Sequence, residues 1–316
     1  MDQSPINLLS NKTEEETKME KGIKTHSLYR MVALDLDGTL LQSNHKMADI
    51  QAQYLRSLHS RGFTVCIATG RAAPSVYEHV QKLNFPEPIP VVCSNGALGL
   101  YCGKDLTKQE IFYNPVPKSL VLETLRIAKD NGHAVQYYFE DSIYTTASDD
   151  PIHLKHTETY SRLTGCKIEG VKDNFQSLLG EGKLPSKLLV IFDEKFGTTA
   201  KQVYEEGLGP QSQATIVSGA FDWFLEILHP EVTKGDGLKN ICSALGIPIE
   251  ECIAMGDGTN DIEFLDLSGL GIAMKNGKDG AKKAADVTME WTNDQHGVMR
   301  TLQRLDSRGF LALTDY

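Results

Sequence analysis

The chain has 316 residues, of which 41% are hydrophobic and 23% are charged, a composition typical of an ordinary globular protein. Its length is enough for two domains. The formal net charge of -10 argues against a general role in binding nucleic acid or an anionic membrane surface. No apolar run approaches the roughly 18 residues that a membrane-spanning helix requires.

The first 28 residues are predicted to form a poorly ordered tail. They lack the apolar core of a signal peptide, and the run Lys12-Thr13-Glu14-Glu15-Glu16 places acidic charge where that core would lie. The six cysteines form no C-x-x-C pair and no zinc-ligand spacing, so free thiols in a reducing compartment are expected. The sequence therefore predicts a cytoplasmic protein.

From Met31 onward, short apolar runs alternate with helical patterns. Strands are predicted over 32–36, 64–68 and 89–93, and apolar residues at helical spacing predict a helix over 47–60. These strands are apolar on both faces and are separated by helices. Such a pattern indicates a parallel sheet that is covered on both sides.

The pattern changes after residue 96. Adjacent strand pairs mixed with helices indicate a separate α+β unit over 97–227, and the strand–helix alternation returns from Lys234 to a last helix near 298–305. The predicted fold class is therefore α/β. A Rossmann-like, doubly wound parallel sheet forms a core from residues 29–96 and 228–316, and the α+β domain is inserted into it.

The run Asp35-Leu36-Asp37-Gly38-Thr39 directly follows the first predicted strand. Two carboxylates that leave a buried strand two residues apart project toward one ligand, and without a cation they would repel each other. Gly38 allows a sharp turn beneath them, and the Thr39 hydroxyl could anchor that turn. A hard divalent ion such as Mg²⁺ suits such all-oxygen ligands.

This run has two simpler interpretations. A calcium-binding EF-hand that begins at Asp35 requires Gly and Glu at its sixth and twelfth positions, where the chain has Leu40 and Lys46. An ordinary surface turn with chance acidic residues is the other alternative. The remaining motifs make that alternative less favourable.

Three further groups follow predicted strands or open predicted helices: Thr69-Gly70-Arg71, Lys234-Gly235, and Gly256-Asp257-Gly258-Thr259-Asn260-Asp261. Each has a simple alternative: a helix cap for Thr69, a solvated lysine for Lys234, and a second EF-hand, which Ile262 and Ser268 exclude. In an open α/β sheet, loops at the carboxyl ends of the strands share one crevice. The sequence therefore predicts that these groups meet.

These four motifs, in this order, resemble those of the haloacid dehalogenase superfamily, specifically the Cof-type phosphatases with a large α/β cap of the C2 type. The resemblance extends over about residues 31–305, and further matches are Ser94-Asn95-Gly96-Ala97 and the run Gly271-Ile272-Ala273-Met274 with Asn276. Two residues depart from the family pattern, Gly277 in place of Ala and His296 in place of an acidic residue. Both departures bear on fine specificity rather than on the reaction class.

The resemblance implies a role for each motif residue. Asp35 would be the nucleophile, and Asp37 would be the acid and base. Mg²⁺ would be held by the Asp35 carboxylate, the Asp37 backbone carbonyl and Asp257, while Asp261 would orient this group. The implied substrate-binding residues are Thr69, Gly70, Lys234, Asn95 and Asn260.

The expected function is Mg²⁺-dependent hydrolysis of a small phosphomonoester, such as a sugar phosphate or a cofactor-related phosphate, through an aspartyl-phosphate. The expected partner is a small phosphorylated metabolite, with no nucleic acid and no membrane. One alternative is a sugar phosphomutase or phosphotransferase of the same superfamily. Another is a catalytically silent sensor of a phosphometabolite, although a pure binder has no need of the nucleophile Asp35. The sequence indicates neither the substrate nor an oligomeric state.

Overall fold

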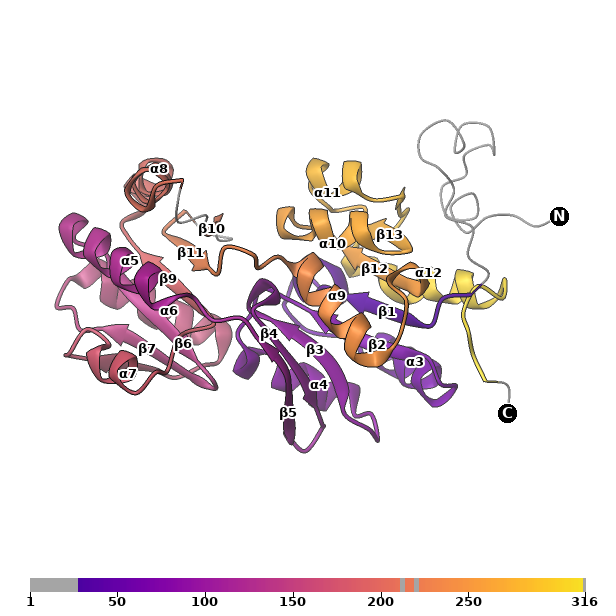
Figure 1. The fold of residues 1–316 in the computed structure, drawn as a ribbon. Coiled ribbons are helices and arrows are strands. Elements are labelled where there is room, and N and C mark those ends of the chain that lie inside the picture. Colours follow the sequence, from indigo (N-terminus) through magenta and orange to yellow (C-terminus); the bar gives the residue numbers. More distant parts are fainter. Residues whose placement is uncertain (1–27, 211–213, 219–221, 315–316) are drawn as a thin grey trace. The chain divides into compact units, whose positions relative to one another are not determined.

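The computed structural model describes residues 28–210, 214–218 and 222–314, so of the tail expected over residues 1–28 only Leu28 is described. The chain divides into two compact units (Figure 1). The first contains the chain up to Gly70, Tyr77–Phe112 and the chain from Thr233 onward. The second contains Arg71–Val76 and Tyr113–Val232.

The first unit is built on an eight-stranded sheet with the order β14-β13-β12-β1-β2-β3-β4-β5. Strand β1 lies inside it and pairs in parallel with β2 and β12, with Ala33 opposite Cys66 and Ala254. Strand β4 runs antiparallel to β3, so the sheet is mixed at this edge. The strands are β1 (Met31–Leu34), β2 (Thr64–Ala68), β3 (Ile89–Cys93), β4 (Leu98–Cys102), β5 (Lys108–Tyr113), β12 (Cys252–Gly256), β13 (Leu270–Ala273) and β14 (Val287–Thr288).

Helices cover this sheet and bury its side chains. One face packs Ala33 and Cys66 against Leu238 and Phe264 of α9 and α10, while the alternate residue Val32 is also fully buried. On the other side, α3 contacts β2 and α12. The predicted α/β fold is confirmed. The helices are α3 (Asp49–Ser60), α4 (Tyr77–Leu83), α9 (Lys234–Leu245), α10 (Ile262–Leu267), α11 (Asp279–Ala284) and α12 (Gly297–Asp306).

The second unit has a six-stranded sheet with the order β10-β11-β9-β6-β7-β8, antiparallel except where β7 pairs with β8. Val135 and Leu188 belong to a core shared with α5 and α8, whereas Leu189 belongs to a second cluster with Trp223. The strands are β6 (Ala134–Phe139), β7 (Ser142–Thr146), β8 (Ile168–Val171), β9 (Lys187–Ile191), β10 (Thr215–Ser218) and β11 (Phe224–Leu228). The helices are α5 (Lys118–Asn131), α6 (Pro151–Thr164), α7 (Gln176–Gly180) and α8 (Gly197–Leu208).

The bounds of the second unit differ from those of the inserted domain expected over 97–227. The hairpin of β4 and β5 extends the first sheet, because β4 pairs with β3. Conversely, Arg71–Val76 groups with the second unit, where Ala72 joins a buried cluster and the Ser75 hydroxyl lies 3.1 Å from Cys166 Sγ. The segment Arg71–Val76 follows a strand of the first unit but packs with the second, and such a long-range contact cannot be recognised from the local sequence pattern.

Helix α9 begins at Lys234, the residue from which the strand–helix alternation was expected to return. Thr233 caps it, since its hydroxyl oxygen accepts a hydrogen bond from the Asp236 N–H at 3.1 Å. Gly235 and Gly237 lower helix propensity but allow close packing: a Cβ on Gly237 would lie 2.5 Å from Val92 Cγ1. Strands β8 and β14 and helices α7 and α11 were not predicted.

Among the described residues, no helix is both long enough and apolar enough to cross a membrane.

In the second unit, His133 precedes β6 and lies between two aromatic rings. Its ring centroid is 5.5 Å from that of Phe192 and 5.9 Å from that of Tyr204, and its Nδ1 is 3.2 Å from the Tyr204 hydroxyl oxygen. Burial lowers the pKa of His133 from 6.5 to about 4. Between these values the unfolded chain binds more protons, so this residue makes the free energy of unfolding rise with pH.

We predict that His133→Phe reduces the slope of the free energy of unfolding against pH between about pH 4 and 6.5. The reduction should correspond to up to about one bound proton, because Phe binds no proton in either state. The measurement is chemical denaturation of both proteins at several pH values, and the slopes are compared rather than the absolute stabilities. Parallel slopes would show that His133 titrates equally in the folded and unfolded chains.

Candidate active site

The loop after β1 carries the first acidic residues of the site. Asp35 is 6% exposed, and the backbone then forms a wide turn, Leu36–Leu40, in which the Leu41 N–H donates to the Leu36 carbonyl at 2.8 Å. Gly38 has φ of 77°, and a Cβ there would lie 2.4 Å from Asp257 Oδ2. Glycine is therefore required both by the backbone angle and by the close approach of the loop after β12.

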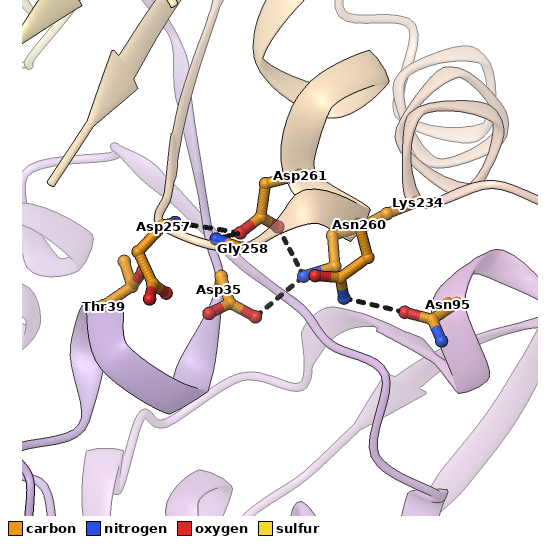
Figure 2. Close-up of polar contacts among 8 residues, drawn as sticks. All are labelled: Asp35, Thr39, Asn95, Lys234, Asp257, Gly258, Asn260 and Asp261. Carbon is orange, nitrogen blue, oxygen red and sulfur yellow. Dashed lines mark hydrogen bonds and ion pairs between the residues drawn. The ribbon is translucent and has the colours of Figure 1, made fainter. Parts of the chain in front are cut away.

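The neighbouring strand ends bring distant residues to the same place. Thr69 and Gly70 follow β2, Asp257 follows β12, and both strands flank β1. Lys234 is the first residue of α9, a helix that packs near β3 and α10. Figure 2 shows Asp35, Lys234 and Asp257 converging from these separate elements. The parallel sheet is what aligns the ends of its strands.

Lys234 is the central cation of the group. Its side chain is 0% exposed, and Nζ donates to Asp35 Oδ1 at 2.7 Å and to Asp261 Oδ1 at 2.6 Å (Figure 2). The other oxygen of Asp261, Oδ2, accepts from the N–H groups of Asp257 at 2.9 Å and Gly258 at 2.7 Å. Asp261 thus joins the buried lysine to the loop that carries Asp257.

The charges of this group are strongly coupled. Burial raises the pKa of Asp35 well above its usual range; Lys234 opposes this, and Asp261 and Asp257 add to it. Burial and then the Asp261 charge raise the pKa of Asp257 to about 6. Burial lowers the pKa of Lys234, but the nearby carboxylates outweigh it and leave that pKa above its ordinary value. One lysine does not neutralise three carboxylates, so the group favours a further cation.

The donor set fits a hard metal ion. Asp35, Asp257 and Asp261 each offer an oxygen, and these atoms lie within 4.8 Å of one another. Both Asp261 oxygens already accept hydrogen bonds, which leaves Asp35 and Asp257 as the better ligands. The Thr39 hydroxyl donates to Asp257 Oδ1 at 3.1 Å and orients that carboxylate. The Asp37 side chain is outside this group and contacts His45 instead.

Two asparagines and a glycine form a second polar group. Asn260 Nδ2 donates to Asn95 Oδ1 at 2.9 Å (Figure 2), and a Cβ on Gly70 would lie 2.8 Å from the same Asn95 oxygen. Asn95 has φ of 54°, a left-handed conformation that asparagine tolerates, and its N–H donates to the Thr69 carbonyl at 3.1 Å. All nine predicted site residues therefore lie on these loops or at the start of α9, and only the side chain of Asp37 points away from the group.

Several supporting residues were not assigned a site role from the sequence. Asn276 Nδ2 donates to the Gly38 carbonyl at 2.7 Å, and the Asn293 N–H donates to Asn276 Oδ1 at 3.0 Å. Two signals could have identified Asn276: its match to the family pattern, and its position after β13, another strand of the same sheet. The departure at Gly277 suits this packing, because a Cβ there would lie 2.9 Å from the Met274 carbonyl oxygen.

Comparisons with known proteins agree on one family. The sequence profile of the haloacid dehalogenase-like hydrolases matches residues 32–302. A phosphatase of Bacillus subtilis is 27% identical over 300 residues, covering 87% of this chain and 99% of its own length. The 5-amino-6-(5-phospho-D-ribitylamino)uracil phosphatase of the same organism is 29% identical, with 86% of this chain and 96% of its own covered.

A solved structure has the same fold. The crystal structure of a haloacid dehalogenase-like hydrolase from Bacteroides thetaiotaomicron superposes with a TM-score of 0.74 at 25% identity. The match covers 88% of this chain and 99% of that one.

We predict that Lys234→Met lowers the free energy of unfolding by about 3–5 kcal/mol, because it leaves buried carboxylates without their cation. Adding Asp35→Asn should recover part of this loss, since it removes one of those charges. The measurement is chemical denaturation of the two variants without divalent ions. Lys239→Met is the control, because Lys239 lies on the same helix in an exposed ion pair with Asp236. A loss as small as that of the control would contradict the prediction.

Proposed function

Since the chain belongs to the haloacid dehalogenase-like hydrolases and is a Cof-type phosphatase, we propose that it hydrolyses a small phosphomonoester through an aspartyl-phosphate on Asp35, with Mg²⁺ bound. The observation that carries the proposal is the buried Asp35 carboxylate, held at 2.7 Å by Lys234 beside Asp257. A nucleophile of this kind must be kept ionised despite its burial. Lys234 supplies part of the positive charge that this requires, and we assign the rest to the proposed Mg²⁺.

In the first step, one Asp35 carboxylate oxygen forms a bond to phosphorus as the bond from phosphorus to the leaving oxygen breaks. Lys234 donates to Oδ1 and orients the carboxylate for this attack. Asp37 gives its proton to the leaving oxygen. In the second step, Asp37 takes a proton from a water molecule, which attacks phosphorus and releases inorganic phosphate and the free Asp35 carboxylate.

The phosphoryl oxygens require hydrogen-bond donors and positive charge that stabilise their negative charge during the transfer. We assign this role to the Thr69 hydroxyl, the Gly70 N–H, Lys234, Asn95 and Asn260. The hydrogen bond of 2.9 Å between Asn260 and Asn95 supports a shared position for the two amides. Asp261 acts on this group indirectly, because it holds Lys234 in place.

Asp35, Asp257 and the Asp37 backbone carbonyl are the proposed ligands of Mg²⁺. When bound, the ion neutralises negative charge on the phosphoryl group and lowers the repulsion between the carboxylates. Its fit rests on the oxygen donors within 4.8 Å and on the surplus of negative charge among them. Asp261, with both oxygens engaged, is the orienting residue.

The proposed substrate class is a small phosphorylated metabolite. The relative named as a 5-amino-6-(5-phospho-D-ribitylamino)uracil phosphatase supports this class. We assign the choice among such substrates to the second unit, as a cap. The six cysteines are buried free thiols, which supports a reducing, cytoplasmic location.

We predict different defects for the two acids of the first motif. Asp35→Asn abolishes both phosphoenzyme formation and turnover, because the nucleophile is lost. Asp37→Asn lowers turnover by about 10²–10⁴-fold, the usual contribution of acid–base catalysis. It still forms phosphoenzyme from acetyl phosphate, whose leaving group needs little protonation, and releases it slowly. The measurement is rapid-quench trapping of ³²P-labelled protein.

Label that accumulates on Asp35→Asn would contradict the assignment of the nucleophile. A folded Asp37→Asn protein that traps no label from acetyl phosphate would contradict the division of roles between the two residues. Circular dichroism of both variants serves as the control for folding.

We also predict that Asp257→Asn raises the Mg²⁺ concentration required for half-maximal activity by about tenfold or more, because a charged ligand is replaced by a neutral one. Calorimetric titration with Mg²⁺ alone measures the same loss of affinity without catalysis. The matched control is Glu263→Gln, which removes an exposed carboxylate from α10. Unchanged Mg²⁺ binding in Asp257→Asn would refute its role as a ligand.

A further inference from the structure

The proposed acid and base, Asp37, has a neighbour that the catalytic scheme leaves without a role. His45 Nδ1 lies 3.2 Å from Asp37 Oδ1, and the two side chains are 65% and 45% exposed. An exposed pair of this kind contributes little to folding stability. The backbone around His45 nevertheless shows that its position is closely defined.

The turn that presents His45 has an unfavourable backbone conformation. His45 has φ of 60°, in the left-handed region that residues other than glycine rarely adopt. Two backbone hydrogen bonds close the turn, from the His45 N–H to the Gln42 carbonyl at 2.8 Å and from the Gln42 N–H to the Lys46 carbonyl at 3.0 Å. The Lys46 N–H also donates to Asn44 Oδ1 at 2.9 Å. This network holds His45 in the left-handed conformation.

The same turn is attached to a distant part of the first unit. Asp294 accepts from the Ser43 N–H at 2.8 Å and from the Ser43 hydroxyl at 2.6 Å, across 251 positions of sequence. These hydrogen bonds keep the pKa of Asp294 below its usual value. Next to it, Asn293 Nδ2 donates to the Leu41 carbonyl at 2.9 Å. The segment between the acidic motif and His45 is therefore anchored at both Leu41 and Ser43.

We propose that His45 is a positioning residue that holds the Asp37 carboxyl group in place for proton transfer, and that the Ser43–Asp294 contact fixes the turn from which it acts. This inference rests on the proposed function, which makes Asp37 the acid and base. Imidazole suits the task because it can donate a hydrogen bond to ionised Asp37 or accept one from protonated Asp37. The contact thus serves both steps of the reaction.

The test uses leaving groups of different basicity, because help from Asp37 matters most when the leaving oxygen is strongly basic. Phenyl phosphate and p-nitrophenyl phosphate are the two probes. We expect His45→Gly to lower kcat about tenfold on phenyl phosphate and much less on p-nitrophenyl phosphate, since a displaced acid transfers its proton poorly. Glycine keeps the left-handed backbone, so the loss reports the missing side chain.

His45→Asn is the conservative variant. Asparagine tolerates the left-handed conformation and offers an amide near the position of Nδ1, so it should restore most of the kcat on phenyl phosphate. Lys46→Ala is the matched control from the same turn, because the Lys46 side chain is exposed and makes no hydrogen bond or ion pair with any described residue. It should behave as the unmodified protein does on both probes.

Three outcomes would overturn the inference. Equal losses on both probes would show that His45 acts only on structure or binding. No loss in His45→Gly, or a gain on phenyl phosphate, would show that the contact is dispensable or holds Asp37 away from the leaving group. Asp37→Asn, measured on the same probes, separates this inference from the proposed function. If Asp37→Asn loses no more kcat on phenyl phosphate than on p-nitrophenyl phosphate, the proposed acid–base role of Asp37 is itself wrong.

Discussion

The buried ion-pair group around Lys234 is the interaction on which the site depends. A lysine without solvent exposure bonds to Asp35 and Asp261, two residues that lie in loops from different strands. An unpaired charge at this depth would be strongly destabilising, so the fold must keep all three groups together. The contact between Lys234 and Asp35 therefore avoids an unpaired buried charge and also holds Asp35, the proposed nucleophile, in place. Stability of the first unit and reactivity of Asp35 are therefore linked through a single ammonium group.

Close approach of loops is the second constraint on the site. The loop at Gly38 approaches the Asp257 carboxylate so closely that any Cβ would collide with it, and Gly70 has the same relation to Asn95. These glycines let the backbone itself come near the place where phosphoryl oxygens are proposed to bind. Asn276 then supports the Gly38 carbonyl from another strand end. The narrow spacing is a property of the loops as a set, because no single loop could create it.

The acidic motif divides its two aspartates between different surroundings. Asp35 is buried beside a lysine, whereas the Asp37 side chain is partly exposed and contacts His45. A nucleophile requires fixed charge and exclusion of water, while a group that exchanges protons with a leaving group and with water requires access to both. Asp35 and Asp37 are only two positions apart in the sequence. They can meet these opposite needs because the turn after Asp35 departs from helical geometry at Asp37.

The sequence by itself determined the alternation of strands and helices, and with it the strand ends at which Asp35, Thr69 and Asp257 were expected. Strands that are buried on both faces appear in the sequence as short continuous apolar runs, and parallel strands present their carboxyl ends at one edge, so this much follows from local pattern. Only the tertiary structure decided that Asp261 also accepts hydrogen bonds from the backbone N–H groups of Asp257 and Gly258, and that Asp294 anchors the turn of His45. The physical reason is that such contacts join segments of irregular backbone far apart in the chain, where hydrogen-bond geometry depends on the whole path between them.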